Sequence, residues 1–269
     1  MISFGLASLW IPAELPLAFP VQALPQPLEP ALPPARIHLP LPRSLAEWRD
    51  SENSGDYFSA IEPTRFGYLV WSEFPVKVYL DSHQESRSQL NDPSVWTEAV
   101  VAALDEWTVY VPLAQVASPD DADIAVWRRT PSIQDLGISR DDLLNGNYRI
   151  RSAETRYEFR LTHSPDFESR LTHRFDIFLS PNQTAQYIQA SARHELGHAL
   201  GIWGHSPVEA DAMYFSQVRQ PARISARDIN TLKKIYEQPT QLGWPVNVDE
   251  SNEHVFTQEA NHRALQDHR

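Results

Sequence analysis

The chain contains no cysteine among its 269 residues, so disulfide bonds, thiolate metal ligands and catalytic thiols are excluded. It also lacks any run of about 18 apolar residues, the length that a membrane-spanning helix requires. Basic side chains are scarce, because 23 lysines and arginines stand against 35 aspartates and glutamates and leave a net charge of −12. This balance argues against a general affinity for nucleic acids or for anionic membrane surfaces.

Prolines concentrate near the N-terminus, where ten of the 22 lie between Pro12 and Pro42. Proline fixes extended backbone geometry and removes hydrogen-bond donors, so we predict a leader or linker over residues 1–45. An extended arm along the domain or its cleft, as in a pro-segment, is the alternative. The start of the chain, Met1 to Ala13, is apolar but has no basic residue, so it makes a poor secretory signal and localisation stays open.

Three further parts are expected after the leader. Residues 46–70 are predicted as a connecting segment, residues 71–240 as a domain of mixed helices and strands, and residues 241–269 as a polar tail. Hydrophobic alternation predicts strands at 74–80, 122–127, 157–161 and 173–179.

Three helices of this domain have start signals in the sequence. The signals are Asn91 or Asp92 before Pro93, Ser180 before Pro181 with Gln183 completing a capping box, and Ser225 with Asp228 three residues later. Each helix also has an apolar stripe at helical spacing, which predicts a buried face. The stripes are Trp96, Val100, Ala103 and Trp107; then Ile188, Ala192, Leu196 and Leu200; and then Ile229, Leu232 and Tyr236.

The second of these helices carries His194 and His198, four residues apart and therefore one turn above each other on a single face. Glu195 follows the first histidine directly and projects to the side where a metal-bound water would lie. Gly201 can end the helix in a left-handed conformation, so that His205 returns to supply a third nitrogen. Three neutral imidazoles with one open position are typical of a catalytic zinc site.

These residue types predict hydrolytic chemistry. Zinc lowers the pKa of a bound water from about 15.7 to about 7, and Glu195 would accept the proton and deliver it to a leaving amine. The alternative is that the histidines are surface residues of an ordinary helix, although the full H-E-x-x-H-x-x-G-x-x-H pattern is far rarer by chance than its first half. Met213 lies eight residues after His205 and offers a thioether base beneath the imidazoles, but a lone methionine also serves as core filler.

The segment from His194 to Tyr214 resembles the metzincin metalloproteases. It reads His194-Glu195-x-x-His198-x-x-Gly201-x-x-His205 and then Asp211-Ala212-Met213-Tyr214, which is similar to the Met-turn of that family. Matrixin-like features are Ser206 after the third histidine, the strand opening at Ala122 and the helix opening at Ile224–Asn230. The resemblance covers roughly residues 71–237.

This resemblance implies an α+β fold of the metzincin or zincin-like type, with a twisted mixed sheet, an active-site helix and a C-terminal helix. It also implies a zinc-dependent endopeptidase that acts on a protein or peptide substrate. In such an enzyme Zn²⁺ is bound by His194, His198 and His205, the catalytic base and acid is Glu195, and structural support comes from Gly201 and Met213. The peptide would lie extended beside an edge strand, which we place at Ala122–Trp127.

Two features depart from the matrixin pattern. The Gly- and Asp-rich stretch that holds structural zinc and calcium is missing; the residues that remain there could hold a second zinc or be surface polar groups, and they are His163, Asp166, His173 and Asp176. A cysteine switch is impossible without cysteine. Ser54-Gly55-Asp56 is either ordinary turn chemistry or a faint counterpart of the zinc-blocking aspartate of astacin-type zymogens.

Two other functions stay open at this stage. A non-catalytic zinc protein could keep the ligands and bind peptides, although zinc binding alone does not need Glu195. A zinc hydrolase of a non-peptide amide would have a closed pocket instead of an extended cleft, and in either enzyme Trp203, Tyr214 and residues 215–224 are expected to shape the specificity pocket. The sequence predicts no nucleic-acid partner and no membrane span, and it leaves further ions and the oligomeric state open.

Overall fold

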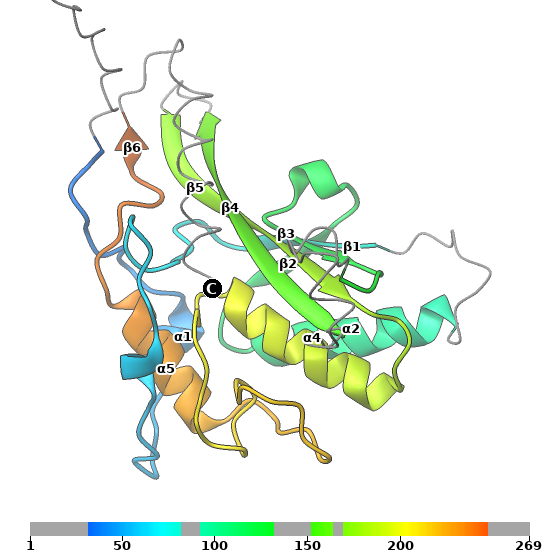
Figure 1. Cartoon of the computed structure of the whole chain (residues 1–269). Coiled ribbons are helices and arrows are strands. Elements are labelled where there is room, and N and C mark those ends of the chain that lie inside the picture. The colour runs from blue at the N-terminus through cyan, green and yellow to red at the C-terminus, as the bar shows by residue number, and fades with distance from the viewer. Residues whose placement is uncertain (1–31, 82–91, 132–151, 164–168, 247–269) are drawn as a thin grey trace, which may run out of the picture.

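The computed structural model describes residues 32–81, 92–131, 152–163 and 169–246 (Figure 1). Within these residues six strands form one open, mixed sheet: β1 (Val76–Leu80), β2 (Leu113–Val116), β3 (Ile124–Trp127), β4 (Ala153–His163), β5 (Ser169–Leu179) and β6 (Pro245–Val246). The strand order is β2-β1-β3-β5-β4, with β6 also paired to β5. Neighbours from β2 to β5 are parallel, whereas β4 and β6 run antiparallel to β5.

Four α-helices complete the described part of the fold: α1 (Arg43–Glu47), α2 (Pro93–Thr108), α4 (Ala185–Ala199) and α5 (Ala226–Tyr236). Helices α2 and α4 lie side by side beneath the sheet, and α1 packs against α5 (Figure 1). The indole of Trp107 on α2 donates to the Arg193 carbonyl on α4 at 2.9 Å, which ties the two helices together. The arrangement is compatible with the predicted α+β class. No helix among these residues has the length and apolar character needed to cross a membrane.

Helices α2 and α5 begin where their capping residues predict. Asp92 accepts a hydrogen bond from the Ser94 backbone N–H at 2.9 Å, and Pro93 occupies the first turn of α2. Ser225 and Asp228 form the reciprocal capping box of α5. The predicted apolar stripes of both helices are buried: Trp96, Val100, Ala103 and Trp107 in α2, and Ile229, Leu232 and Tyr236 in α5.

The predicted start of α4 is wrong by four residues, because the helix begins at Ala185 and not at Pro181. Ser180 is held at the end of the sheet instead, where its backbone N–H donates to the Ser152 carbonyl at 2.8 Å. Its hydroxyl accepts a hydrogen bond from the Asn182 backbone N–H and so forms a local turn. The apolar stripe of α4 is nevertheless buried as predicted: Ile188, Ala192, Leu196 and Leu200.

Strand β3 lies inside the sheet, so the predicted cleft beside Ala122–Trp127 is misplaced. It pairs with β1 on one side and with β5 on the other. The outer position beside α4 belongs to β4, whose eleven residues pair with β5 along their whole length. The sequence predicted only Tyr157–Leu161 of this strand because its first residues, Ala-Glu-Thr-Arg, show no hydrophobic alternation. Strand β2 has no buried residue and was not predicted for the same reason.

Residues that precede β1 contribute to the same core as the helices and the sheet. Four of their buried side chains are Leu45, Tyr57, Phe66 and Leu69. The described part of the leader lies along the C-terminal segment, where Arg36 and Thr240 exchange two backbone hydrogen bonds of 3.0 Å. Residues 1–31 of the predicted leader and 247–269 of the predicted tail lie outside the described residues.

Candidate metal centre

Three histidines converge near the C-terminal end of α4. His194 and His198 lie on the helix, and His205 returns to them after the chain has turned at Gly201. One ligand atom of each lies within 4.8 Å of the others, and among the described residues this is the one such group of His, Asp and Glu side chains. His194 and His198 are half-buried, whereas His205 is exposed. The structure therefore brings together the three predicted ligands in a cluster that could hold a metal ion.

Main-chain carbonyls orient both helical histidines. His194 Nδ1 lies 2.9 Å from the Ala212 carbonyl oxygen, and His198 Nδ1 lies 2.8 Å from the Ile202 carbonyl oxygen. A carbonyl oxygen only accepts, so each Nδ1 carries a proton, and in the neutral form of the ring Nε2 then presents a lone pair. Such a bond fixes both the tautomer and the ring orientation of a metal-ligating histidine.

The spacing of the two Nε2 atoms suits a tetrahedral ion. They are 3.1 Å apart, and two lone pairs that face each other at this distance repel unless a cation lies between them. Zinc–nitrogen bonds of about 2.0–2.1 Å in tetrahedral geometry place two ligand nitrogens about 3.3 Å apart. The donor set and its geometry therefore fit zinc, while the structure leaves the identity of the metal open.

Gly201 produces the sharp turn that returns His205. Its φ of +121° is a conformation that residues with a side chain rarely adopt, and a Cβ there would lie 2.5 Å from the Leu69 carbonyl oxygen. The end of α4 is fixed further by the Trp71 indole, which donates to the Ala199 carbonyl at 2.9 Å. The predicted role of Gly201 as helix terminator is confirmed.

Met213 packs against α4 at the helical turn between His194 and His198. It is fully buried, and a Cβ built on Gly197 would lie 2.2 Å from the Met213 sulfur and 3.1 Å from the Trp107 ring. Gly197 is therefore the residue that lets the thioether approach the helix backbone between His194 and His198. The sequence singled out Met213 but not the need for a glycine opposite it.

Replacing Gly197 with Ala is expected to lower the free energy of unfolding by about 1–3 kcal/mol through overpacking against Met213. Helix propensity alone predicts the opposite sign, a gain of about 1 kcal/mol, so urea unfolding decides between the two effects. In a Met213→Ala background the same substitution should cost less, because the sulfur is gone. A stabilised Gly197→Ala protein would contradict the close contact.

Asp228 at the start of α5 holds the Met213 turn in place. Its carboxylate accepts hydrogen bonds from the Ala212 N–H at 3.0 Å, the Ser225 N–H at 2.8 Å and the Tyr57 hydroxyl at 2.6 Å. Burial raises the pKa of Asp228, although these hydrogen bonds pull it down. Because the Ala212 carbonyl orients His194, α5 is linked to a candidate metal ligand through a single residue, Ala212. The sequence identified Asp228 only as a capping residue.

A second network closes the same turn. The Ser206 N–H donates to the Met213 carbonyl at 2.8 Å, and the Ser206 hydroxyl donates to the buried carboxylate of Asp211. Arg227 of α5 pairs with Asp211 at 3.0 Å. Ser206 thus anchors the segment that follows His205, which gives a structural reason for the serine at this position.

Glu195 lies next to His194 on α4 and reaches towards β4. The Thr155 hydroxyl, on the third residue of that strand, donates to Glu195 Oε2 at 2.7 Å. Thr155 was not singled out in the sequence, because it lies outside the segment predicted as a strand. The contact places the candidate catalytic carboxylate between the metal ligands and the outer strand of the sheet.

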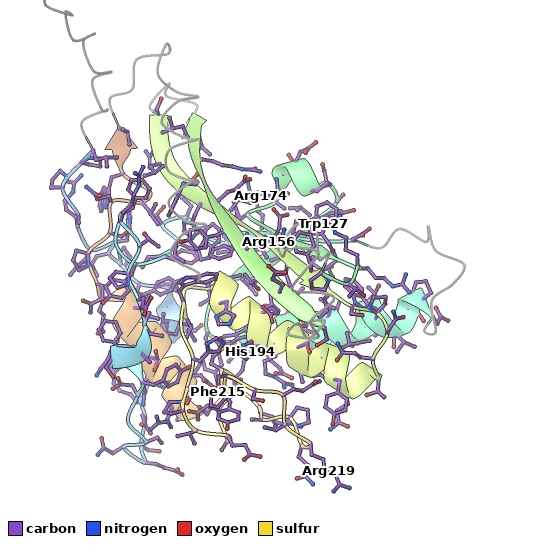
Figure 2. All side chains as sticks on the ribbon, viewed as in Figure 1. Trp127, Arg156, Arg174, His194, Phe215 and Arg219 are labelled. Carbon is purple, nitrogen blue, oxygen red and sulfur yellow. The ribbon has the colours of Figure 1, made fainter. Side chains whose placement is uncertain are left out.

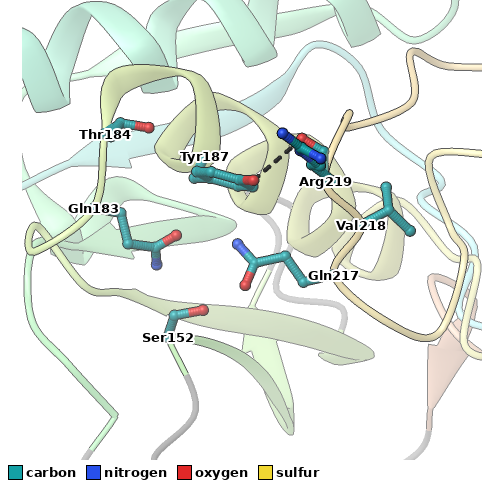
Figure 3. Close-up of a pocket in the computed structure, with 7 residues that line it drawn as sticks. All are labelled: Ser152, Gln183, Thr184, Tyr187, Gln217, Val218 and Arg219. Carbon is teal, nitrogen blue, oxygen red and sulfur yellow. Dashed lines mark hydrogen bonds between the residues drawn. The ribbon is translucent and has the colours of Figure 1, made fainter.

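A pocket of about 430 Å³ opens at the N-terminal end of α4 (Figure 3). Gln183 and Gln217 point towards each other across it, and the Tyr187 hydroxyl donates to the Arg219 carbonyl at 3.2 Å. Tyr187 precedes His194 by seven residues, so both lie on the same face of α4, about 10 Å apart along its axis. The pocket is lined by Ser152, Gln183, Thr184, Tyr187, Gln217, Val218 and Arg219.

The residues that the sequence predicts to shape the specificity pocket lie in different parts of the structure. Gln217 to Arg219, within the predicted segment 215–224, form one wall of this pocket. Trp203 packs instead on His198 and on Tyr157 of β4. In Figure 2, His194 lies on the side of α4 that faces the segment carrying Phe215, which is exposed.

Of the four residues considered for a second metal site, the two whose side chains the structure describes, His173 and Asp176, do not form one. His173 is buried between Trp71 and Phe175, and burial lowers its pKa to about 3, so the imidazole is neutral. The expectation of a surface residue is wrong for His173. Asp176 accepts a hydrogen bond from the Trp127 indole at 2.7 Å. Asp166 lies outside the described residues, as does the side chain of His163.

Ser54-Gly55-Asp56 is an irregular segment that lies against α5. Gly55 has a φ of +79°, and Asp56 accepts the Phe58 N–H at 3.0 Å and pairs with Lys234 of α5 at 2.6 Å. The Lys234 ammonium and these hydrogen bonds hold the pKa of Asp56 below its usual value. These contacts occupy the Asp56 carboxylate and argue against its acting as a zinc-blocking aspartate.

The site defines a class of protein: a mixed α/β domain in which two histidines and a glutamate of one helix meet a third histidine from the segment that follows it. Comparisons with protein-family models and with curated proteins find no match to this chain.

Proposed function

We propose that this protein is a zinc-dependent metalloendopeptidase with a metzincin-type, matrixin-like catalytic domain. The observation that carries the proposal is the convergence of His194, His198 and His205 beside Glu195. His194, Glu195 and His198 lie on α4, which is next to the outer strand β4. Nitrogen ligands in tetrahedral spacing favour Zn²⁺ over Ca²⁺ or Mg²⁺, which prefer oxygen. Three protein ligands leave a fourth position for chemistry.

Different residues of the chain have different roles in peptide hydrolysis. When bound, zinc supplies a Lewis acid that polarises the substrate carbonyl and lowers the pKa of water. Glu195 accepts a proton from the attacking water on a carboxylate oxygen and delivers it to the nitrogen of the leaving amine. The carbonyls of Ala212 and Ile202 keep His194 and His198 oriented throughout.

Strand β4 supports a peptide as the substrate instead of a small amide. Among the described strands β4 pairs with β5 alone, and the outer strand of a sheet is where an extended peptide adds. A peptide bound there passes Glu195 at the level of Thr155. The pocket about 10 Å further along α4 can then receive a side chain about three residues from the scissile bond.

Metal removal tests the proposal. We expect one zinc per chain by mass spectrometry and cleavage of casein or of a quenched peptide. Treatment with 1,10-phenanthroline should remove both, and one equivalent of zinc should restore both, because the ligands are preformed by the fold. The non-chelating isomer 1,7-phenanthroline is the control and should change neither.

A protein without zinc and without cleavage would contradict the proposal. Stoichiometric zinc without cleavage, in the full chain and in a variant lacking residues 1–31, would favour a non-catalytic zinc protein. The deletion must end before Leu45, since this side chain and that of Phe66 belong to the core.

A further inference from the structure

We propose that Thr155 is a positioning residue that holds Glu195 in the orientation required for proton transfer. This inference rests on the proposed function. The Thr155 hydroxyl lies 2.7 Å from Glu195 Oε2 and 3.2 Å from the Glu195 carbonyl oxygen. It has one proton, and a carboxylate is a stronger acceptor than a backbone carbonyl, so the proton goes to Oε2.

The strand fixes where this hydroxyl lies. Thr155 pairs with Ile177 of β5 in the antiparallel ladder and is only 9% exposed. Side chains alternate along β4, so Thr155 and Tyr157 face α4, where the Tyr157 ring packs on Trp203. Arg156 points to the opposite face and pairs with Glu154 at 2.9 Å (Figure 2). A backbone hydrogen-bonded in a sheet therefore presents the hydroxyl to the helix.

Glu195 needs such a restraint because its side chain has three torsions, and the terminal one is broad and has no strong intrinsic preference. A bond to one carboxylate oxygen sets the plane of the carboxylate and hence the direction of the other oxygen. Errors of about 1 Å in the position of a catalytic group can lower rates about 100-fold. A misplaced Glu195 carboxylate therefore slows the chemical step and does not change the binding of substrate.

Two substitutions distinguish the effect of the Thr155 hydroxyl from the effect of the side-chain shape. Thr155→Val removes the donor but keeps a β-branched residue in the strand, and Thr155→Ser keeps the donor. We expect Thr155→Val to lower kcat for a quenched peptide by about 10–100-fold with KM within threefold. Thr155→Ser should stay within fivefold of wild type, and all proteins should bind one zinc and melt cooperatively.

Thr108→Val is the matched control, since Thr108 is an exposed threonine of α2 that lies outside the proposed peptide-binding strand and donates its hydroxyl hydrogen bond to the Leu104 carbonyl. It should leave kcat unchanged. Wild-type kcat in Thr155→Val, or equal losses of kcat in the Val and Ser variants, would overturn the positioning role and leave the endopeptidase proposal intact.

A binding measurement tests Thr155 independently of turnover. Acetohydroxamic acid chelates zinc through its two oxygens and gives a hydrogen bond to a correctly oriented carboxylate. Its Kd for the zinc-loaded protein should rise about five- to tenfold in Thr155→Val and in Glu195→Gln, and stay unchanged in Thr155→Ser and Thr108→Val. Equal affinities for wild type and Thr155→Val would overturn the inference even if wild type cleaves no peptide. A protein that binds no zinc would overturn both proposals.

Discussion

Replacing Glu195 with Gln is expected to lower kcat for peptide cleavage by about 10²–10⁴-fold while the protein keeps its zinc. The amide cannot accept a proton from the attacking water, but it has the same size and can still accept the Thr155 hydrogen bond. The imidazoles of His194 and His198 stay in place because their orientation depends on the Ala212 and Ile202 carbonyls. Quenched-peptide kinetics with metal analysis on the same samples measure both quantities.

The matched control is Glu209→Gln, which removes an exposed carboxylate in the loop that follows His205. It should change kcat less than twofold, although it alters the net charge by the same amount. Unchanged cleavage by Glu195→Gln would remove the general base from the mechanism. Loss of zinc in that variant would mean that Glu195 contributes to metal binding instead.

Replacing Asp228 with Ala is expected to lower the free energy of unfolding by about 3–5 kcal/mol, the second large effect. The substitution leaves the Tyr57 hydroxyl and the N–H groups of Ala212 and Ser225 without their acceptor at a position that is fully buried. It also removes one half of the α5 capping box. Urea unfolding of the zinc-free proteins gives the stability difference.

Two further variants keep this prediction testable if Asp228→Ala does not fold. Asp228→Asn retains one acceptor oxygen and should lose less stability than the alanine variant, and Asp105→Ala removes an exposed aspartate of α2 and should change stability by less than about 0.5 kcal/mol. Zinc affinity should also fall about 10–100-fold in Asp228→Asn, because the Ala212 peptide that orients His194 is loosened. A stability loss below about 1 kcal/mol in Asp228→Ala would contradict the role assigned to this carboxylate.

The sequence by itself determined the starts of two helices and the spacing of the candidate metal ligands. The starts of α2 and α5 depend on capping bonds between residues two or three apart, so Asp92 and the Ser225–Asp228 pair predict them correctly. His194 and His198 share a helical face by spacing alone, and the left-handed turn at Gly201 follows from the residue type. Each of these features is decided within a few residues of chain.

Only the tertiary structure decided which strand lies beside the ligands. Thr155 and Glu195 are 40 residues apart, and their contact requires β4 to add to the outside of β5. Strand order depends on long-range hydrogen bonds that hydrophobic alternation does not encode, so β3 was assigned to the edge although it lies inside the sheet. Packing likewise decided the burial of His173 and the contact between Gly197 and Met213, because these depend on side chains that come from distant elements.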